Sequence, residues 1–556
     1  MDYIKEYQKW IGNADEETKK ALMTMNETEI EDAFYRCLEF GTGGLRGVMG
    51  AGTNRMNVYT VRKATQGVAN EILSHGGDLA EKGVVIAYDS RNNSAEFAYE
   101  CTRVLCANGI KTYIFDSLRP TPELSFAVRY LGCVRGIVIT ASHNPKEYNG
   151  YKVYGEDGGQ IPPETAETIL KFIDQTDIFN DVRLTDKPNS IIIGDEVDRA
   201  YIEAVKAQSC GTKIPGDFKT VYTPLHGSGN LFVRKILSEI GVKNVFTVPE
   251  QEMPDGDFPT VQSPNPENSE AFDIAVKYAM DQNADIVFGT DPDSDRIGVV
   301  VRNAEGEYMV LNGNQTGCLL CEYILRKSME NGTLPSDGTV VKTIVTTETV
   351  RAIAADYGIE TIDVLTGFKF IGDQIKGFED KGRAERFVFG LEESYGYLKG
   401  TYARDKDAVV AAMLICEAAA DYKAKGMTLY EGLQAIYEKY GYANEQLKTI
   451  TLKGIDGAEQ IQSIMSRFRN EKLPIEIIKR LDYSEGIDGL PKSDVLKFFT
   501  PNGWFAVRPS GTEPKIKFYF GAYAKNKEIA QAEMVKMAAA AMLVADPSAF
   551  AAPSAQ

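Results

Sequence analysis

A serine beside a histidine stands at the end of an apolar run of the chain. Residues 136–142 read GIVITAS, and His143, Asn144 and Pro145 follow. The apolar part has the composition and length of a buried strand, and Asn-Pro is a turn signal. Ligands of open α/β sheets bind beyond the carboxyl ends of the strands. Ser142 is therefore a candidate for chemistry, and an ordinary polar turn is the alternative on these residues alone.

Three carboxylates recur at alternate positions after a second strand-like segment. The segment DIVFGT is followed by Asp291, Asp293 and Asp295. Alternate residues of an extended segment project to one side, so the three can converge on one hard cation. The calcium loop of an EF-hand would need glycine and glutamate where this chain has Arg296 and Arg302. The pattern favours a metal site of another kind over an acidic surface turn, because unpaired clustered carboxylates repel each other.

An anion pocket is suggested near the end of the chain. The segment RPSGTEPK runs from Arg508 to Lys515 and contains Ser510, Gly511 and Thr512. Arginine offers a planar fork to phosphate oxygens, hydroxyls add donors, and glycine exposes backbone N–H groups. A plain hairpin turn is the alternative.

Two more polar groups follow strand-like segments. Glu392 and Ser394 could bind adjacent hydroxyl groups of a sugar, and helix capping explains them equally well from the sequence. The dense charge run of residues 404–407, Arg-Asp-Lys-Asp, is typical of a solvated face. Cys318 and Cys321 have CxxC spacing in a helix-like segment without partner ligands, which favours core packing.

Together these groups indicate one chemistry. A serine nucleophile, a divalent cation and a separate anion loop are the parts of phosphoryl transfer through a covalent phosphoenzyme. Acyl transfer is disfavoured because the chain has no Gly-x-Ser-x-Gly elbow around Ser142, and a kinase is disfavoured by the missing nucleotide loops.

Composition limits the partners. The 556 residues carry a formal net charge of −18, with 43% hydrophobic and 25% charged residues. Such a surface should repel nucleic acid and anionic membranes, although it allows a local basic pocket for an anionic substrate. The N-terminus lacks the apolar core of a signal peptide, and the apolar runs are too short to cross a bilayer. We therefore expect a cytoplasmic protein.

The elements that must position these residues are strands alternating with helices. Strand, polar turn and helix recur from about residue 84, start afresh near 210 and again near 316, and give way to a different pattern in the last hundred residues. This alternation predicts an α/β fold with mostly parallel sheets covered on both faces, plus a smaller C-terminal α+β domain. We place the domains at 1–207, 208–315, 316–443 and 444–556.

The motifs, in their order and approximate spacing, resemble those of the α-D-phosphohexomutase superfamily. TASHNP at 140–145, DPDSDR at 291–296, GLEES at 390–394 and RPSGT at 508–512 carry the resemblance. FGTGGLRG at 40–47 and YTPLHG at 222–227 look like the branch of bacterial phosphoglucomutases and phosphopentomutase-like enzymes. The resemblance implies three related α/β domains and a C-terminal domain around a central cleft.

The resemblance also implies roles for individual residues. Ser142 would be the phosphorylated serine and would share Mg²⁺ with Asp291, Asp293 and Asp295. Lys152 would be a general acid or base, assisted by His143 and Arg46. The substrate would be bound by Arg296, Lys369, Glu392, Ser394, Arg508, Ser510, Gly511 and Thr512.

The implied reaction interconverts glucose 1-phosphate and glucose 6-phosphate through glucose 1,6-bisphosphate. Phosphopentomutase, phosphomannomutase and sugar-bisphosphate synthase activities are the alternatives. Hexomutases often carry a histidine in the sugar loop, where this chain has Ser394 followed by Tyr395, Gly396 and Tyr397, so the second acid/base group is left unassigned. We expect a phosphosugar as the partner, no nucleic acid or membrane, and a monomer or homodimer.

Overall fold

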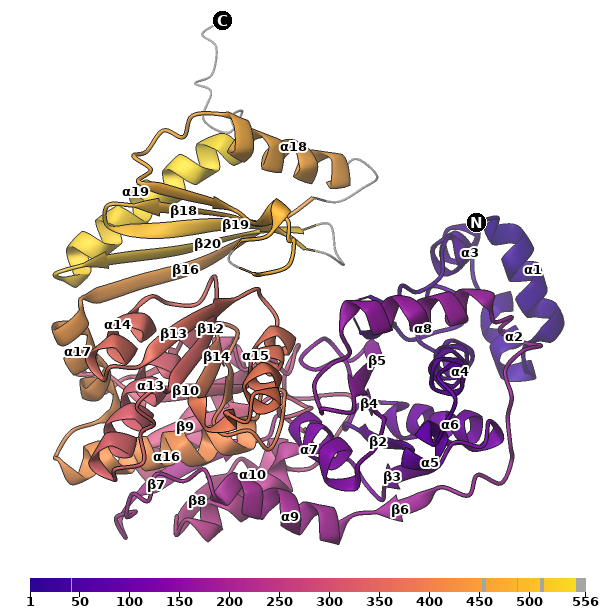
Figure 1. Ribbon diagram of the computed structural model, residues 1–556, viewed down its shortest axis with the longest axis horizontal. Helices are drawn as coiled ribbons and strands as arrows, with labels where there is room; N and C mark the ends of the chain where they lie inside the picture. The colour runs from indigo at the N-terminus through magenta and orange to yellow at the C-terminus, as the bar shows by residue number, and fades with distance from the viewer. Residues whose placement is uncertain (42, 453–456, 488, 511–514, 547–556) are drawn as a thin grey trace, which may run out of the picture.

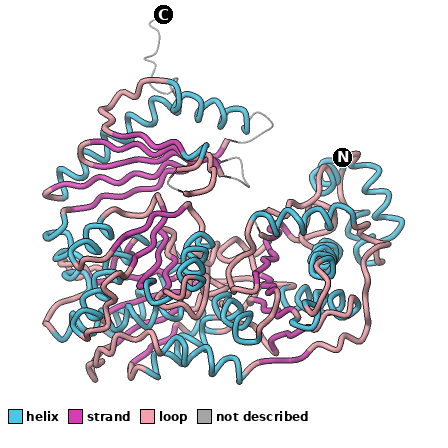
Figure 2. Tube along the Cα trace, viewed as in Figure 1, coloured by secondary structure: helices cyan, strands magenta, loops and turns pink. Residues whose placement is uncertain are grey.

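Four β-sheets organise the chain in the computed structural model, which describes residues 1–41, 43–452, 457–487, 489–510 and 515–546. Figure 1 shows the first unit, in indigo and purple, beside the second and third, with the C-terminal unit beyond the third. Figure 2 shows that helices surround the strands of the first three units. The predicted α/β fold is confirmed.

The first sheet has the order β1-β5-β4-β2-β3-β6. Strands β4, β2, β3 and β6 run parallel. At one edge β5 pairs antiparallel with β4, and β1 pairs antiparallel with β5. Its strands are β1 (Gly44–Val48), β2 (Val84–Tyr88), β3 (Thr112–Phe115), β4 (Arg135–Ile139), β5 (Tyr148–Gly155) and β6 (Ile191–Ile193). Its helices are α4 (Val58–Ser74), α5 (Leu79–Lys82), α6 (Ser94–Ala107), α7 (Thr121–Leu131), α8 (Pro163–Gln175) and α9 (Asp195–Lys206).

The second sheet has the order β11-β10-β9-β7-β8, and the third has the order β13-β12-β14-β15. The second unit holds β7 (Lys219–Thr223), α10 (Gly229–Glu239), β8 (Asn244–Thr247), α11 (Pro249–Glu252), η1 (Ser269–Phe272), α12 (Asp273–Gln282), β9 (Ile286–Thr290), β10 (Ile297–Arg302) and β11 (Tyr308–Leu311). The third holds α13 (Gly313–Glu330), β12 (Thr339–Thr343), α14 (Thr349–Asp356), β13 (Glu360–Val364), α15 (Phe368–Asp380), η2 (Ala384–Arg386), β14 (Phe387–Glu392), β15 (Gly396–Leu398), α16 (Ala408–Ala424) and α17 (Leu429–Tyr440).

One strand order recurs in all three units. The orders β5-β4-β2-β3, β10-β9-β7-β8 and β15-β14-β12-β13 have the same connectivity, with three parallel strands and a final antiparallel one. The connection from the third to the fourth strand carries Ser142 in the first unit, Asp291 to Asp295 in the second and Ser394 in the third. The three candidate loops are therefore equivalent positions of one repeated fold.

The alternating burial of β4 explains why Ser142 is fixed at its end. Val138 packs into a core that runs through the first three units, whereas Ile137 and Ile139 pack into the core on the opposite face of the first sheet. Successive strand residues point to opposite faces, and a strand covered on both faces is continuously apolar. The three apolar residues thus anchor the strand from both sides.

The C-terminal unit is built differently. Its sheet, β16-β20-β19-β18-β17, is antiparallel throughout and is packed against two helices, as Figure 1 shows. Its elements are β16 (Tyr442–Thr451), α18 (Gly457–Asn470), β17 (Lys479–Asp482), η3 (Tyr483–Glu485), β18 (Leu496–Thr500), β19 (Gly503–Pro509), β20 (Lys515–Ala524) and α19 (Lys527–Ala545). A separate apolar cluster joins it to the third unit, with Ile344 and Leu365 on one side and Trp504 and Tyr519 on the other.

Three short helices precede the first sheet: α1 (Tyr3–Asn13), α2 (Glu16–Met23) and α3 (Glu27–Phe34). Asp2, Asp15 and Asn26 accept hydrogen bonds from backbone N–H groups of the first helical turns, which satisfies donors that a helix start leaves free. The buried Trp10 and Phe34 pack these helices into a small core of their own. Within the described part of the chain, no helix is long and apolar enough to cross a membrane.

Candidate active site

Ser142 sits in a strained turn directly after β4. Its φ of 53° is left-handed, which is uncommon outside glycine, and its side chain is buried at 3% exposure. Its backbone N–H donates to Oγ1 of Thr140 at 2.8 Å, and Thr140 in turn donates to Oδ2 of Asp89 at 2.6 Å. The surrounding hydrogen bonds hold a conformation that the isolated backbone would avoid.

The Ser142 hydroxyl contacts groups from two units. It donates to Oδ2 of Asp291 at 2.7 Å and lies 3.1 Å from Nδ1 of His143. Burial, together with the cations Arg296 and Arg46, holds the pKa of His143 well below its usual range. A neutral imidazole therefore lies beside the hydroxyl at neutral pH, where it can accept or donate one hydrogen bond.

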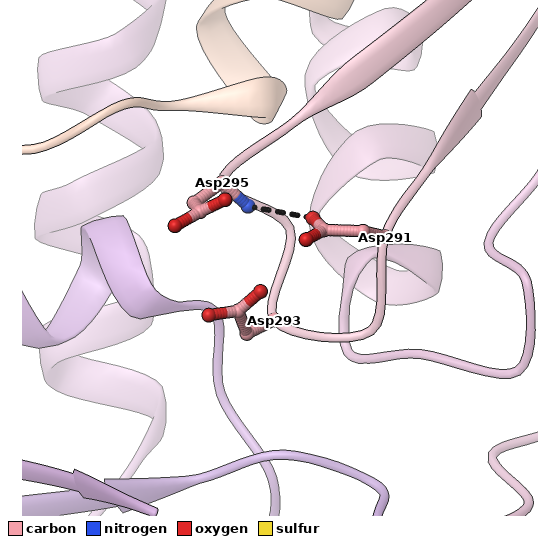
Figure 3. A group of neighbouring side chains, drawn as sticks. All are labelled: Asp291, Asp293 and Asp295. Atoms are coloured by element: carbon pink, nitrogen blue, oxygen red, sulfur yellow. Dashed lines mark hydrogen bonds between the residues drawn. The ribbon is translucent and has the colours of Figure 1, made fainter. Parts of the chain in front are cut away.

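The aspartate trio, Asp291, Asp293 and Asp295, lies in the turn between β9 and β10 (Figure 3). Each offers one oxygen, and these oxygens lie within 4.8 Å of one another. Oδ1 of Asp291 accepts the backbone N–H groups of Asp295 at 3.1 Å and Arg296 at 3.0 Å, which closes the turn. The trio is buried, with exposures of 0–2%. The predicted convergence of the three carboxylates is confirmed.

The donor set of the trio fits a hard divalent cation. Oδ1 of Asp293 and Oδ1 of Asp295 are buried and accept no hydrogen bond among the described residues. Burial and the neighbouring carboxylates raise the pKa of Asp291 well above its usual value. Buried acceptors without donors are costly, and carboxylate oxygens are the ligands that Mg²⁺ prefers. These residues could therefore hold Mg²⁺, with Ser142 at the same centre.

Two lysines from different units contact the trio: Lys406 is buried and Lys152 is largely buried. Lys152 of β5 reaches Oδ2 of Asp293 at 3.0 Å, and Lys406 reaches Oδ2 of Asp295 at 3.1 Å. Burial opposes the charge of Lys152, but the carboxylates of Asp293 and Asp295 outweigh it and hold its pKa above the usual value. Opposite charges within about 4–6 Å favour the ionised form of both partners.

The interpretation of residues 404–407 as a solvated face is wrong. The exposures of these four side chains are between 0% and 7%. Lys406 also pairs with Asp405 at 3.0 Å, and the carboxylate of Asp405 accepts from Tyr154 of the first unit at 2.6 Å. Three units meet here, and these side chains find their partners in the other units. Four successive charges in the sequence therefore marked a buried network and not a surface exposed to water. Sequence reasoning missed Lys406 for this reason.

The sugar-loop candidates lie at the end of β14. Glu392 is 6% exposed and accepts the backbone N–H of Gly367 at 2.9 Å. Burial raises the pKa of Glu392 to about 7. Ser394 is half-buried in the following turn, which Tyr395 closes with a φ of 67°. Lys369 lies on α15 near the ring of Phe370, 5.1 Å from its centroid, and burial lowers the pKa of Lys369.

Two further candidates, Arg46 and Arg296, differ in exposure and in their partners. Arg46 of β1 is exposed and donates to Oδ1 of Asn144 at 3.4 Å. Arg296 pairs with Glu267 at 2.5 Å at the edge of the trio.

Of the anion-loop candidates, Arg508 lies on β19 and Ser510 directly follows that strand. Because β19 pairs antiparallel with β20, the hairpin and the anion-pocket interpretations are compatible. Arg508 is half-buried on β19 opposite Lys517 of β20. Burial and the positive charges of Arg508 and Arg296 lower the pKa of Lys517. The carboxylates of Glu267 and Glu393 oppose this shift. The backbone N–H of Ser510 donates to the carbonyl of Lys515 at 2.7 Å. The predicted residues Gly511 and Thr512 lie outside the described residues.

Comparisons with known proteins agree with this architecture. Four sequence models of the phosphoglucomutase/phosphomannomutase family match the chain: alpha/beta/alpha domain I at residues 38–178, domain II at 199–306, domain III at 312–440 and the C-terminal domain at 457–538. A phosphoglucomutase of Staphylococcus saprophyticus is 38% identical over 540 residues, covering 93% of this chain and 96% of the relative. A phosphoglucomutase of Staphylococcus aureus is 36% identical, with coverages of 93% and 95%.

Solved structures share the fold at low identity. A phosphoglucomutase/phosphomannomutase family protein from Burkholderia thailandensis has a TM-score of 0.68 at 19% identity, with 92% of this chain and 98% of that chain covered. The open form of parafusin, a phosphoglucomutase from Paramecium, also has a TM-score of 0.68, at 18% identity, with coverages of 93% and 96%. The resemblance of the motifs is thus confirmed over most of the chain. The chain belongs to the phosphoglucomutase/phosphomannomutase family of the α-D-phosphohexomutase superfamily.

Proposed function

We propose that this chain is a phosphoglucomutase that interconverts glucose 1-phosphate and glucose 6-phosphate through a phosphorylated Ser142. The observation that carries the proposal is the 2.7 Å hydrogen bond between Ser142 Oγ and Asp291 Oδ2, which places a nucleophile against a buried carboxylate cluster. The relatives from Staphylococcus that are named phosphoglucomutase support the choice of sugar.

Asp291, Asp293, Asp295 and the Ser142 oxygen would hold one Mg²⁺. When bound there, the ion supplies positive charge to the phosphoryl oxygens as the group moves. The unbonded oxygens of Asp293 and Asp295 support this assignment.

Basic side chains would carry out proton transfer and balance charge at the site. We assign Lys152 as the general acid or base for the sugar hydroxyl that exchanges the phosphoryl group. Its ammonium can donate a proton to this oxygen when the phosphoryl group leaves it, and Lys152 must first lose its own proton before it can remove one from the hydroxyl. His143 and Arg46 assist, His143 by its contact with the Ser142 hydroxyl and Arg46 by its charge near Asn144. Lys406 pairs with Oδ2 of Asp295 at 3.1 Å, and Lys152 lies 3.7 Å from the same oxygen. We leave the second acid/base group open between Lys406 and a group of the substrate.

Recognition of the substrate falls to the third and C-terminal units. Glu392 and Ser394 would accept and donate hydrogen bonds to adjacent sugar hydroxyls. Arg508 and Ser510, with Gly511 and Thr512, would bind the phosphate that is not transferred, because arginine and backbone N–H groups suit phosphate oxygens. Arg296 and Lys369 would add positive charge for an anionic substrate. Glucose 1,6-bisphosphate would be the intermediate, and it would reorient within the site before the second transfer.

A phosphopentomutase, a phosphomannomutase and a sugar-bisphosphate synthase are the second candidates. The observation in their favour is Tyr395 after Ser394, because this turn is where the sugar hydroxyls would be read. A panel of glucose, mannose and ribose 1-phosphates, each with its own bisphosphate, separates them by kcat/KM.

We also propose the domain limits 1–207, 208–315, 316–443 and 444–556, in a cytoplasmic monomer or homodimer. The sheets support the first two boundaries, since the strands of the first three sheets begin and end at 44–193, 219–311 and 339–398, each within one proposed domain. The fourth sheet begins with β16 at Tyr442, two residues before the proposed start of the last domain.

The decisive test is the mass of the protein after incubation with glucose 1,6-bisphosphate. The native chain should gain one phosphoryl group, and Ser142→Ala should gain none. The variant should lose turnover by a factor on the order of 10⁶, the scale seen when an enzyme loses its nucleophile. Ser238→Ala, on the exposed side of α10, is the matched control and should behave as the native chain. Phosphorylation that persists in Ser142→Ala would overturn the assignment of the nucleophile.

A further inference from the structure

Arg91 is a fully buried arginine next to the strained serine turn. It follows β2 in the segment Asp89-Ser90-Arg91, and its side chain has 0% exposure. Residues 140–148, which are the turn after β4 and the first residue of β5, are called the serine loop below.

The guanidinium group of Arg91 binds four carbonyl oxygens of the serine loop. Nη2 donates to the carbonyls of Ser142 at 2.6 Å and of Asn144, and Nη1 donates to those of Pro145 at 2.9 Å and Tyr148 at 3.1 Å. The five N–H donors of arginine lie in one rigid plane, which allows one side chain to serve several acceptors at fixed angles. A lysine has a single nitrogen and cannot reach carbonyls spread over seven residues of loop.

The charge of Arg91 is balanced without using the serine loop. Asp89 lies 3.4 Å from its Nε, and both side chains are buried. Asp89 also accepts from the backbone N–H of Arg91 at 3.0 Å and from the hydroxyl groups of Ser94 and Thr140. The ring of Phe258 in the second unit covers the guanidinium, with 5.0 Å between Arg91 Cζ and the ring centroid. A buried, paired arginine whose remaining donors all face one loop is thus built into the first unit and covered by the second.

The serine loop needs such support. The left-handed φ of Ser142 is strained and persists only where neighbouring groups fix the backbone. One of the four carbonyls that Arg91 binds belongs to Ser142 itself. The second unit also bonds to the backbone of the loop, from Ser263 Oγ to the carbonyl of His143 at 2.7 Å.

We propose that Arg91 is a positioning residue, whose hydrogen bonds to the serine loop fix the Ser142 hydroxyl in line with the aspartate trio. Arg91 acts through the backbone and touches no reacting atom. This inference rests on the proposed phosphoserine mechanism, because it assigns Arg91 to the placement of that serine.

Arg91→Lys tests the proposal, because it keeps the charge beside Asp89 but removes the planar set of donors. We expect kcat to fall about 100-fold, the cost of a displacement of about 1 Å at a reacting group. The KM for glucose 1-phosphate should stay within about threefold, because the binding groups lie in other loops. The rate of Ser142 phosphorylation by glucose 1,6-bisphosphate, followed by intact mass, should fall with kcat.

Arg135→Lys is the matched control. Arg135 lies at the opposite end of β4 and binds the carbonyl of Val134 and the carboxylate of Glu71. It is also largely buried, so a general loss of packing would affect both variants alike. Arg135→Lys should keep the native kcat.

Rescue separates positioning from folding. Arg91→Ala leaves space for a guanidinium ion, and guanidinium chloride at non-denaturing concentration should restore part of its kcat without restoring that of Ser142→Ala. Hydrogen exchange should show faster exchange of amides 142–148 in Arg91→Lys, a readout that does not depend on turnover.

Three results would overturn the proposal: native kcat in Arg91→Lys, an equal loss in Arg135→Lys, or unchanged amide exchange in the serine loop. If Arg91→Lys does not fold, the Arg91→Ala rescue decides, and its failure also counts against the proposal. A native chain that is neither phosphorylated nor active would instead refute the proposed function, before any variant is compared.

Discussion

The hydroxyl of Ser142 donates a hydrogen bond of 2.7 Å to Asp291, although 149 residues separate the two in the chain. The two loops occupy the same position in successive copies of one strand order, after the third strand of each unit. Because the core of the first three units is continuous, the two loops are held at a fixed separation by packed side chains. A reaction that needs a nucleophile beside a metal site is thereby pre-organised.

The first prediction concerns the aspartate trio. Mg²⁺ at 100 times its Kd should stabilise the native chain by about 2.7 kcal/mol, because binding to the folded state alone shifts the unfolding equilibrium. Asp293→Asn removes a central ligand oxygen and should lose this stabilisation. Thermal unfolding with and without Mg²⁺ measures it. Asp281→Asn, exposed on α12, is the control, and equal Mg²⁺ stabilisation of both variants would refute the metal assignment.

The second prediction concerns pH and Glu392. Burial raises the pKa of this carboxyl to about 7. Below that pH the group is protonated and is a poorer acceptor for sugar hydroxyls, so kcat/KM should rise as pH increases through about 7. Glu392→Gln should remove this limb of the profile and lower kcat/KM. Retention of the same limb in Glu392→Gln would assign it to another group.

The third prediction concerns Lys406 and its carboxylates. Lys406→Met leaves Asp295 and Asp405 without this ammonium, and breaking a buried ion pair on one side costs about 3–5 kcal/mol. Asp405→Asn in the same chain should recover part of that loss, because it removes one uncompensated charge. Urea unfolding of the two single variants and the double variant gives the coupling energy.

Lys425→Met is the matched control for this cycle. Lys425 pairs with Asp421 across one helical turn and is 46% exposed, so its loss should cost less than about 1 kcal/mol. A cost for Lys406→Met as small as that of the control would contradict the buried network.

The fourth prediction concerns the junction of the third and C-terminal units. Lys497 of β18 donates to the carbonyl of Ile344 at 2.7 Å and to Glu348 at 3.0 Å. Burial, with the neighbouring Lys342, lowers the pKa of Lys497 to about 8, while Glu348 and Asp363 oppose the shift. Between about pH 8 and the unfolded value near 10.4, the unfolded chain binds more protons at this group than the folded chain, so stability from this group rises with pH.

The size of that rise is up to roughly 3 kcal/mol, since one pKa unit corresponds to about 1.4 kcal/mol. Lys497→Met should flatten the pH dependence of the thermal midpoint between pH 8 and 10. Arg480→Met, on the neighbouring β17 and more exposed, is the control. A curve for Lys497→Met parallel to that of the native chain would refute the assignment.

Much of the site could be predicted from the sequence because its residues follow strands. The apolar residues Ile137 to Ile139 predict a strand buried on both faces. Residues that directly follow such a strand lie beyond its carboxyl end, where ligands bind. The alternate spacing of Asp291, Asp293 and Asp295 likewise needs only local geometry to bring the three carboxylates together. Local periodicity therefore determined the fold class and the principal motifs.

The roles of Lys406 and Arg91 could not be predicted from local sequence patterns. A run of charges normally faces water, and only the meeting of three units shows that Lys406 is neutralised by Asp295 and Asp405. Likewise, nothing local distinguishes Arg91 from an ordinary turn residue until the loop 51 positions away folds over its guanidinium.

The sequence by itself determined which residues stand at strand ends and hence which could react. Only the tertiary structure decided which of them meet, because contacts between distant loops depend on how whole units pack, and the burial of a charge depends on partners that adjacent residues do not specify.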